Sequence, residues 1–200
     1  MKVGIIGGSF DPIHFGHLIM AEHLRIEKKL DKIIFIPTGY APHKKYLNSG
    51  KIRIEMVNIA IENNEHFLAC DIEIKKNKIN YTIDTLRELK LKYPDCDFYF
   101  IIGLDNLYNL ETWNEVENLG EMAKFLVSHR IFNEKLSNKN IKDKCLELSK
   151  KYKLNIEIVD TPIIEISSSN IRERIKKELS INYLAPRRVI EYIENNGLYK

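Results

Sequence analysis

Two histidines stand close together just after the first apolar stretch of the chain. In the string GIIGGSFDPIHFGH, which covers residues 4–17, His14 and His17 are separated by two residues, and Gly7 and Gly8 precede them. Imidazole rings at this spacing can bind a metal, act as a general base, donate hydrogen bonds to phosphate, or simply pack in a core. No H-E-x-x-H pattern and no Cys or carboxylate set completes a zinc shell around them, so we expect no metal site.

The glycines before the histidines favour the phosphate-binding alternative. They follow an apolar run at residues 3–6 that predicts a strand, and the pattern after them predicts a helix from about residue 15 to residue 29, with His17 in its first turn. Helix N-termini present free backbone N–H groups and a partial positive charge, both of which attract phosphate. The string has neither the G-x-G-x-x-G nor the G-x-x-x-x-G-K-[ST] spacing, so it is not one of the two familiar nucleotide loops.

A second candidate anion site lies near the other end of the chain, in EISSSNIRERI at residues 165–175. Serines often cap helices, which is the purely structural interpretation of this segment. Three consecutive serines exceed what one cap needs, and with Arg172 they would gather several donors at one helix start. Ile171, Ile175 and Leu179 predict the buried face of that helix, which leaves Arg172 and Lys176 off it. Two anion sites at opposite ends of one chain suit a polyphosphate ligand.

The segments that must position these groups alternate between strands and helices. Short apolar runs rich in β-branched residues predict strands at residues 3–6, 33–36, 98–102, 125–127 and 156–159. Apolar residues at helical spacing lie between them: Ile52, Met56 and Ile59; Ile83, Leu86, Leu89 and Tyr93; Ile141, Cys145, Leu148 and Tyr152. Pro186 predicts the start of a last helix through Val189 and Ile193, with Gly197 as its C-terminal cap.

This alternation predicts an α/β fold: a Rossmann-like, doubly wound parallel sheet with helices on both faces and a helical C-terminal segment at about residues 167–200. The strand runs are apolar throughout, which is typical of strands that are buried on both faces. In such sheets ligands bind beyond the carboxyl ends of the strands. A chain of 200 residues with 44% hydrophobic composition can bury one sizeable core, so we expect a single domain at residues 1–200.

Composition excludes several classes of partner. The chain has 31 basic and 28 acidic residues and a formal net charge of +3, which is too balanced to favour nucleic-acid or membrane binding through bulk charge. The three cysteines lie far apart without metal-binding spacing, so we expect no disulfide framework. No signal peptide precedes the first predicted strand, and no apolar run approaches the ~20 residues that cross a bilayer. We therefore expect a cytoplasmic protein; homo-oligomer formation stays open.

The HFGH string at residues 14–17 matches the [HT]-x-G-H motif of the nucleotidyltransferase superfamily. The wider string at residues 7–17 resembles the signature of the bacterial nicotinate-nucleotide adenylyltransferases. The resemblance extends over nearly the whole chain and implies a single nucleotidyltransferase domain. It implies transfer of AMP from ATP to nicotinate mononucleotide, which yields deamido-NAD and pyrophosphate, with Mg²⁺ carried on the ATP phosphates. The partners are then these two nucleotides.

The same resemblance assigns residues to ATP. Residues 166–172 are similar to the family's I-S-S-[ST]-x-[IV]-R, and Pro42, His43 and Lys44 match its P-P-H-K, from which Ala41 departs. The implied catalytic residues, which would bind the phosphates in the transition state, are His14, His17, Lys44 and Arg172. The implied ATP-binding residues are Gly7, Gly8, Ser9, Phe10, Gly16, Gly103, Asp105, Ile166, Ser168 and Ser169.

The resemblance also assigns residues to nicotinate mononucleotide. The string NYTIDTL at residues 80–86 is similar to the family's S-Y-T-x-D-T-L, and Trp113 matches an aromatic residue that stacks on the pyridine ring. The chain departs from the family at Asn80, at Asn114, where a second aromatic is common, and at residues 129–132, where Arg-Pro-Gly is usual. The implied binding residues are Tyr81, Thr82, Trp113, Asn114, through its backbone N–H, and Arg130.

Two alternatives stay open at this level. The first is an adenylyltransferase of the same superfamily that acts on phosphopantetheine or on the amidated nucleotide; the phosphopantetheine enzymes tend to carry T-x-G-H, so His14 and Trp113 argue against them. The second is a binding module that holds a nucleotide as a sensor without turnover. The joint presence of both histidines with Lys44 and Arg172 argues against that alternative.

Overall fold

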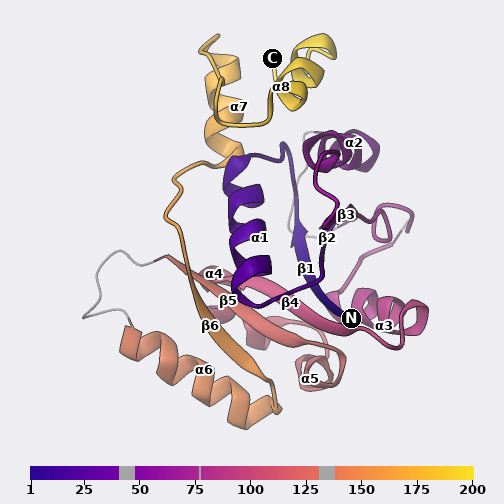
Figure 1. The fold of residues 1–200 in the computed structure, drawn as a ribbon, viewed down its shortest axis with the longest axis vertical. Helices are drawn as coiled ribbons and strands as arrows, with labels where there is room; N and C mark the ends of the chain where they lie inside the picture. The colour runs from indigo at the N-terminus through magenta and orange to yellow at the C-terminus, as the bar shows by residue number, and fades with distance from the viewer. Residues whose placement is uncertain (41–47, 77, 131–137) are drawn as a thin grey trace.

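The computed structural model describes residues 1–40, 48–76, 78–130 and 138–200, apart from the side chains of residues 130, 138 and 139. Within this part of the chain the strands form one six-stranded sheet in the order β3-β2-β1-β4-β5-β6, and neighbouring strands are parallel (Figure 1). The strands are β1 (Lys2–Gly8), β2 (Lys32–Pro37), β3 (Phe67–Ala69), β4 (Asp97–Gly103), β5 (Lys124–Arg130) and β6 (Ile156–Thr161).

The strand order places a topological switch point at the centre of the sheet. From β1 the chain moves outward through β2 to β3, then returns so that β4 pairs with the free side of β1. Ligands of doubly wound sheets bind beyond the carboxyl ends of the strands at this point. Here those ends are Gly8 of β1 and Gly103 of β4. The predicted doubly wound fold is confirmed.

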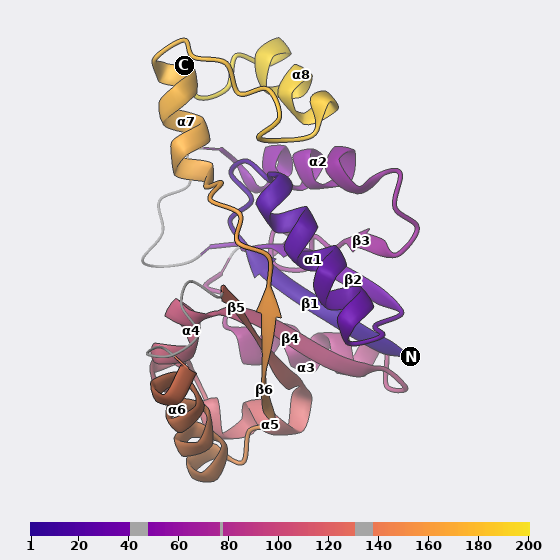
Figure 2. The ribbon, with the colours of Figure 1, turned by 60° about the vertical axis from the view of Figure 1, so that its left-hand side comes forward.

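Helices cover both faces of the sheet. They are α1 (Phe15–Glu27), α2 (Gly50–Ile61), α3 (Thr82–Lys92), α4 (Leu104–Tyr108), α5 (Leu119–Met122), α6 (Asn138–Tyr152), α7 (Ser168–Lys176) and α8 (Arg187–Asn195), with 3₁₀ turns η1 (Leu110–Thr112) and η2 (Val116–Asn118). One face packs on α1 and α2, whose core cluster extends to α7 and α8, and the other face packs on α3, α4, α5 and α6. Figure 2 shows α7 and α8 beyond the start of α1, at one end of the molecule.

The pleat of each strand sends alternate side chains to the two faces. In β4, Phe100 and Ile102 enter the core under α3 and α5, whereas Ile101 enters the core under α1 and α2. The same alternation holds in β5 for Phe125 and Leu126. Because both faces are covered, a strand needs apolar residues at successive positions. This explains the continuous runs in the sequence.

All five predicted strands are present, and the three-residue edge strand β3 is an addition that the sequence pattern did not reveal. Two predictions about helix faces need correction. The predicted face through Leu179 is wrong at its end, because α7 stops at Lys176 and Leu179 is 50% exposed. In α2, Ile52 and Ile59 are only half-buried; the fully buried residues are Arg53, Met56, Val57 and Ile61.

The predicted C-terminal cap is confirmed at Gly197, whose φ is 58°. Its N–H donates to the carbonyl of Glu194 at 3.1 Å, and the N–H of Leu198 donates to the carbonyl of Ile193 at 3.0 Å. This pair of bonds is the Schellman arrangement, in which a left-handed residue reverses the chain after a helix. The reversal buries Leu198 and Tyr199 against the core. None of the described helices has the length and apolar character needed to cross a membrane.

Candidate active site

The two histidines stack on each other at the start of α1. His14 is the N-cap residue and is 5% exposed; its ring centroid lies 3.7 Å from that of His17, with 25° between the planes. The backbone N–H of His14 donates to Nδ1 of His17 at 3.4 Å. A ring nitrogen that accepts a hydrogen bond carries no proton, so the neutral His17 ring bears its N–H at Nε2. His17 is half-buried, which leaves part of its ring accessible.

The turn before the histidines is tightly packed. Phe10 adopts a φ of 48°, is 1% exposed and meets the ring of His17 edge-on at 5.1 Å. A Cβ on Gly8 would lie 2.9 Å from the Phe10 ring, so no larger residue fits there. Because its ring is buried, Phe10 supports His17, and only its backbone is left for the predicted contact with ATP. Gly7, by contrast, is exposed at the end of β1.

The serine-rich segment meets this turn directly. The hydroxyl of Ser168 donates to the carbonyl of Pro12 at 2.8 Å, and Nη1 of Arg172 donates to the carbonyl of Asp11 at 2.7 Å. Nη2 of Arg172 donates to the hydroxyl of Ser169 at 3.1 Å. The two segments predicted to bind anions are therefore adjacent, and the N-terminus of α7 lies against the loop before α1.

Two predicted glycines differ in their surroundings. A Cβ on Gly16 would lie 3.0 Å from Nδ1 of His14 and 3.5 Å from the carbonyl oxygen of Ile166, so this glycine lets the two segments approach. A Cβ on Gly103 would meet no described atom within 4 Å. Gly103 precedes α4 at the switch point, and Asp105 is exposed in the first turn of that helix. Open space at this strand end fits the prediction that a ligand passes there.

A buried carboxylate in the same turn was not singled out from the sequence. Asp11 is 4% exposed, and its Oδ1 accepts hydrogen bonds from the hydroxyl of Tyr199 at 2.6 Å and from Nδ2 of Asn48 at 2.9 Å. Burial and the hydrogen bond to Asp11 raise the pKa of the Tyr199 phenol, so it stays protonated and donates. No local pattern could have revealed this contact, because Tyr199 is distant in sequence.

Arg53 is a second residue that sequence reasoning missed. It is 2% exposed on the buried face of α2, and its guanidinium donates to the carbonyls of Ser9 at 2.9 Å, Thr38 at 2.8 Å and Asn48 at 3.3 Å. It thus ties the loop after β1 to the end of β2. The sequence did contain a signal, because Arg53 stands on the apolar face of its helix. Charged residues are rarely buried unless they have partners, so a charge at such a position indicates a structural or functional contact.

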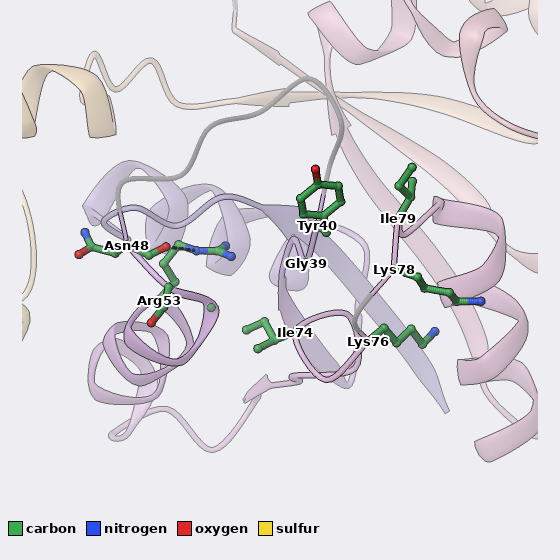
Figure 3. Close-up of a pocket in the computed structure, with 10 residues that line it drawn as sticks. Gly39, Tyr40, Asn48, Arg53, Ile74, Lys76, Lys78 and Ile79 are labelled. Carbon is green, nitrogen blue, oxygen red and sulfur yellow. Dashed lines mark hydrogen bonds between the residues drawn. The ribbon is translucent and has the colours of Figure 1, made fainter.

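A pocket of about 590 Å³ lies beside Arg53 (Figure 3). It is lined by Gly39, Tyr40, Asn48, Ser49, Gly50, Arg53, Ile74, Lys76, Lys78 and Ile79. Figure 3 shows the ammonium groups of Lys76 and Lys78 pointing away from Arg53. Their charges therefore do not converge on one point.

The residues predicted to hold the second nucleotide lie at the start of α3. Tyr81 is the N-cap residue and is 43% exposed, and Thr82 begins the helix. Glu73 fixes this helix start, because it accepts hydrogen bonds from the hydroxyl of Thr85 at 2.9 Å and from the N–H of Gly39 at 3.1 Å. Burial raises the pKa of Glu73 despite these two donors.

Trp113 lies on the other side of the switch point, after η1. Its ring is half-buried and meets Phe100 edge-on, with 5.9 Å between centroids and 89° between planes. Glu111 anchors this segment to α6 through Lys144 at 2.7 Å and Lys151 at 2.8 Å. Hydrogen bonds from these two ammonium groups lower the pKa of Glu111 to about 2. Trp113 therefore has both a packed edge and an exposed part.

The remaining predicted residues are only partly described. Pro42, His43 and Lys44 lie outside the described residues. Arg130 ends β5, and its side chain lies outside the description; Asn114 is exposed next to Trp113. In the described part of the chain, no three His, Cys, Asp or Glu side chains gather as a metal site.

Comparisons with known proteins show the family and the fold. A family model described as cytidylyltransferase-like matches residues 5–174. A relative from Lachnoclostridium phytofermentans, named "Probable nicotinate-nucleotide adenylyltransferase", is 40% identical over 99% of this chain and 98% of its own. A relative from Caldicellulosiruptor bescii with the same name is 40% identical over 100% of both chains. In the solved structure titled "Plasmodium falciparum nicotinic acid mononucleotide adenylyltransferase complexed with NaAD", the protein has the same fold, with a TM-score of 0.79 at 24% identity, over 99% of this chain and 97% of that one.

Proposed function

The chain belongs to the cytidylyltransferase-like family and, within it, to the nicotinate-nucleotide adenylyltransferases, and we propose that the histidine turn and the start of α7 form its catalytic centre. The enzyme transfers the adenylyl group of ATP to nicotinate mononucleotide and releases pyrophosphate, a step of NAD synthesis. A single observation supports the placement of the centre: Ser168 and Arg172 donate to the carbonyls of Pro12 and Asp11, so the start of α7 lies against the loop that carries the histidines.

The reaction needs alignment and charge stabilisation, not proton removal. A phosphate oxygen of nicotinate mononucleotide forms a bond to the α-phosphorus of ATP, and the bond from that phosphorus to the bridging oxygen of the β-phosphate breaks. Pyrophosphate leaves with the electron pair of that bond. The attacking phosphate is already largely ionised at neutral pH, so it needs no general base. The protein must hold two anions together and stabilise the charge that develops on the α-phosphate and pyrophosphate.

His17 is the donor best placed for the α-phosphate. Its Nδ1 accepts the N–H of His14, which makes Nε2 the donor atom of the neutral ring, and the stacked His14 ring with the edge of Phe10 restricts its orientation. A donor that is already oriented stabilises developing charge without reorganising during the reaction. We assign to His14 the same role beside it.

Arg172 and the hydroxyl of Ser169 would bind the leaving phosphates. Ser168, whose hydroxyl donates to the carbonyl of Pro12, would hold the start of α7 in place for them. A guanidinium has five N–H donors, so Arg172 can hold the carbonyl of Asp11 and the hydroxyl of Ser169 and still donate to a phosphate oxygen. The N-terminus of α7 adds backbone N–H groups. We propose that Lys44 binds the triphosphate as well. Magnesium enters as the ion carried by ATP and neutralises part of the phosphate charge.

Nicotinate mononucleotide would lie between the start of α3 and the segment after η1. Trp113 would stack the exposed part of its ring on the flat pyridine ring, and the backbone N–H of the adjacent Asn114 would donate to the carboxylate. We assign further contacts to Tyr81, Thr82 and Arg130. Gly103 and Asp105, at the switch point, would lie against the adenosine.

Product formation from MgATP and each candidate acceptor tests this function. We expect nicotinate adenine dinucleotide and an equal amount of pyrophosphate with nicotinate mononucleotide. We expect a much lower kcat/KM with nicotinamide mononucleotide and no product with phosphopantetheine. Preference for either of the latter acceptors would overturn the substrate assignment. ATP binding without pyrophosphate release would favour a nucleotide sensor.

A further inference from the structure

We propose that Asp11 and Tyr199 are positioning residues for adenylyl transfer, because their hydrogen bond holds the turn before His14 and His17 in its reactive shape. The inference rests on the proposed function, since it concerns the same turn. Neither side chain has to contact a substrate: Asp11 is 4% and Tyr199 is 7% exposed. Both therefore act through the residues beside them.

The contact between the two side chains has the properties of a strong hydrogen bond. The Tyr199 hydroxyl lies 2.6 Å from Oδ1 of Asp11, which is a typical length for an O–H···O⁻ bond. Nδ2 of Asn48 donates to the same oxygen at 2.9 Å. A fully surrounded polar pair is rigid, because either partner would be buried without compensation if the pair separated. The bond thus fixes the position of the Asp11 side chain.

The bond joins two strained segments of backbone. Phe10, the neighbour of Asp11, has a φ of 48°, and Tyr199 itself has a φ of 66°. Residues other than glycine rarely adopt this left-handed region, and they stay there only where surrounding contacts hold them. Since the Phe10 ring supports His17 at 5.1 Å, a relaxed turn would move that imidazole. We infer that the contact with Tyr199 helps to keep the turn from relaxing.

A substitution at Tyr199 can distinguish an effect on the position of the turn from an effect on ATP binding, which substitutions at the contacts from α7 cannot do. Ser168 and Arg172 also hold this turn, but both are assigned to ATP, so their loss would change binding and positioning together. Tyr199 comes from the reversal after α8 that Gly197 makes possible, and its hydroxyl is buried. Losing that hydroxyl should affect the reaction only through the turn.

The test is Tyr199→Phe, which removes the hydroxyl and keeps the ring. Steady-state kinetics with MgATP and nicotinate mononucleotide should show kcat reduced by about tenfold or more, with both KM values within about twofold of wild type. Rates are measured well below the melting temperature and corrected for the folded fraction. Tyr192→Phe is the matched control, because Tyr192 lies in α8 and packs on the same core cluster. The control should leave kcat unchanged.

A second pair of variants keeps the inference falsifiable if Tyr199→Phe is unstable. Asn48→Ala removes another donor to Asp11 and should also reduce kcat with little change in KM. The double variant Asp11→Ala/Tyr199→Phe should be no slower than Asp11→Ala alone, because either single variant already removes the bond between the two side chains. Multiplied effects in the double variant, or an unchanged kcat in Tyr199→Phe, would overturn the inference. An inactive wild type would instead overturn the proposed function itself.

Discussion

Nη1 of Arg172 lies 2.7 Å from the carbonyl oxygen of Asp11, and the two residues are 161 positions apart in the sequence. This bond brings the start of α7 against the loop that follows β1. It converts two separate stretches of potential anion-binding groups into one site. The proposed chemistry depends on this contact, because a triphosphate must be held at several phosphates at once.

Replacing Arg172 with lysine should impair catalysis while the fold persists. A single ammonium cannot reproduce the planar fork that joins Asp11, Ser169 and a phosphate, so we expect kcat/KM for ATP to fall by about 10- to 100-fold. Arg174→Lys is the matched control, because Arg174 is in the same helix and donates to the carbonyl of Ser180 at 2.8 Å. Equal activities of the two variants would contradict the assignment of Arg172.

Removing the imidazole of His17 should reduce turnover far more than ATP affinity. Loss of one oriented donor to a transition state costs about 10²- to 10³-fold in kcat, whereas a contact made equally in the ground state would raise KM. Kinetics of His17→Ala with varied ATP measure both constants. His23→Ala controls for loss of an imidazole from α1, since His23 bonds the carbonyl of Asp160 at 2.8 Å. A parallel loss of affinity and turnover in His17→Ala would indicate ground-state binding only.

Replacing Gly103 with alanine should weaken ATP binding without lowering the stability of the protein. Gly103 has a φ of −86°, which alanine readily adopts, and its Cβ would meet no described atom within 4 Å. We expect Gly103→Ala to melt like wild type and to raise the KM for ATP severalfold. Gly4→Ala should lower the melting temperature and leave the KM for ATP unchanged, because its Cβ would lie 2.5 Å from Cδ1 of Ile33. An unchanged KM for ATP in Gly103→Ala would indicate that ATP does not bind next to Gly103.

Trp113→Ala should raise the KM for nicotinate mononucleotide and leave that for ATP nearly unchanged. Stacking on an aromatic ring contributes about 0.5–1.5 kcal/mol beyond burial, so an increase of up to about tenfold is expected. The variant should also melt at a lower temperature, since the ring packs against Phe100. Trp113→Phe retains an aromatic face and should recover most of the affinity. A lowered melting temperature with unchanged constants would assign Trp113 to packing alone.

The contribution of Glu111 to stability should depend on pH. Its pKa is lowered to about 2 by hydrogen bonds from Lys144 and Lys151, compared with 4.5 for the free group. A lowered pKa in the folded state means that the stabilisation is present above pH 4.5 and is lost as the pH falls toward 2. Urea unfolding of wild type and Glu111→Gln should therefore differ at pH 7 and converge near pH 2. High salt should reduce the difference, because these side chains are partly exposed. A difference that does not change with pH would show that this carboxylate contributes no charge-dependent stability.

Local patterns in the sequence were sufficient for five strands and for the longer helices. The β-branched runs predicted five of the strands, and their continuous apolar character indicated burial on both faces. The three residues of β3 were too few for a recognisable period. Leu179 continued the apolar spacing of α7, yet the helix ended earlier, because spacing alone does not show where a chain leaves its helix.

Some departures from the family pattern acquired a reason only in the structure. Asn80 stands where the family carries a small hydroxyl residue, and its Nδ2 donates to the carbonyls of Glu73 at 3.2 Å and Lys78 at 3.0 Å. A longer amide side chain can reach both carbonyls and hold the segment before α3. This supporting role could not be predicted from residues 80–86 alone.

The sequence by itself determined the fold class and the family, because periodicity and short motifs are local properties of a chain, and it predicted phosphate binding for residues 7–17 and 166–172. Only the tertiary structure decided what holds the histidine turn. Arg53 bonds the carbonyls of Ser9 and Thr38, and Tyr199 bonds Asp11 from 188 positions away. Such partners are chosen by distance and by the need to satisfy buried polar groups, and neither exists until the chain has folded.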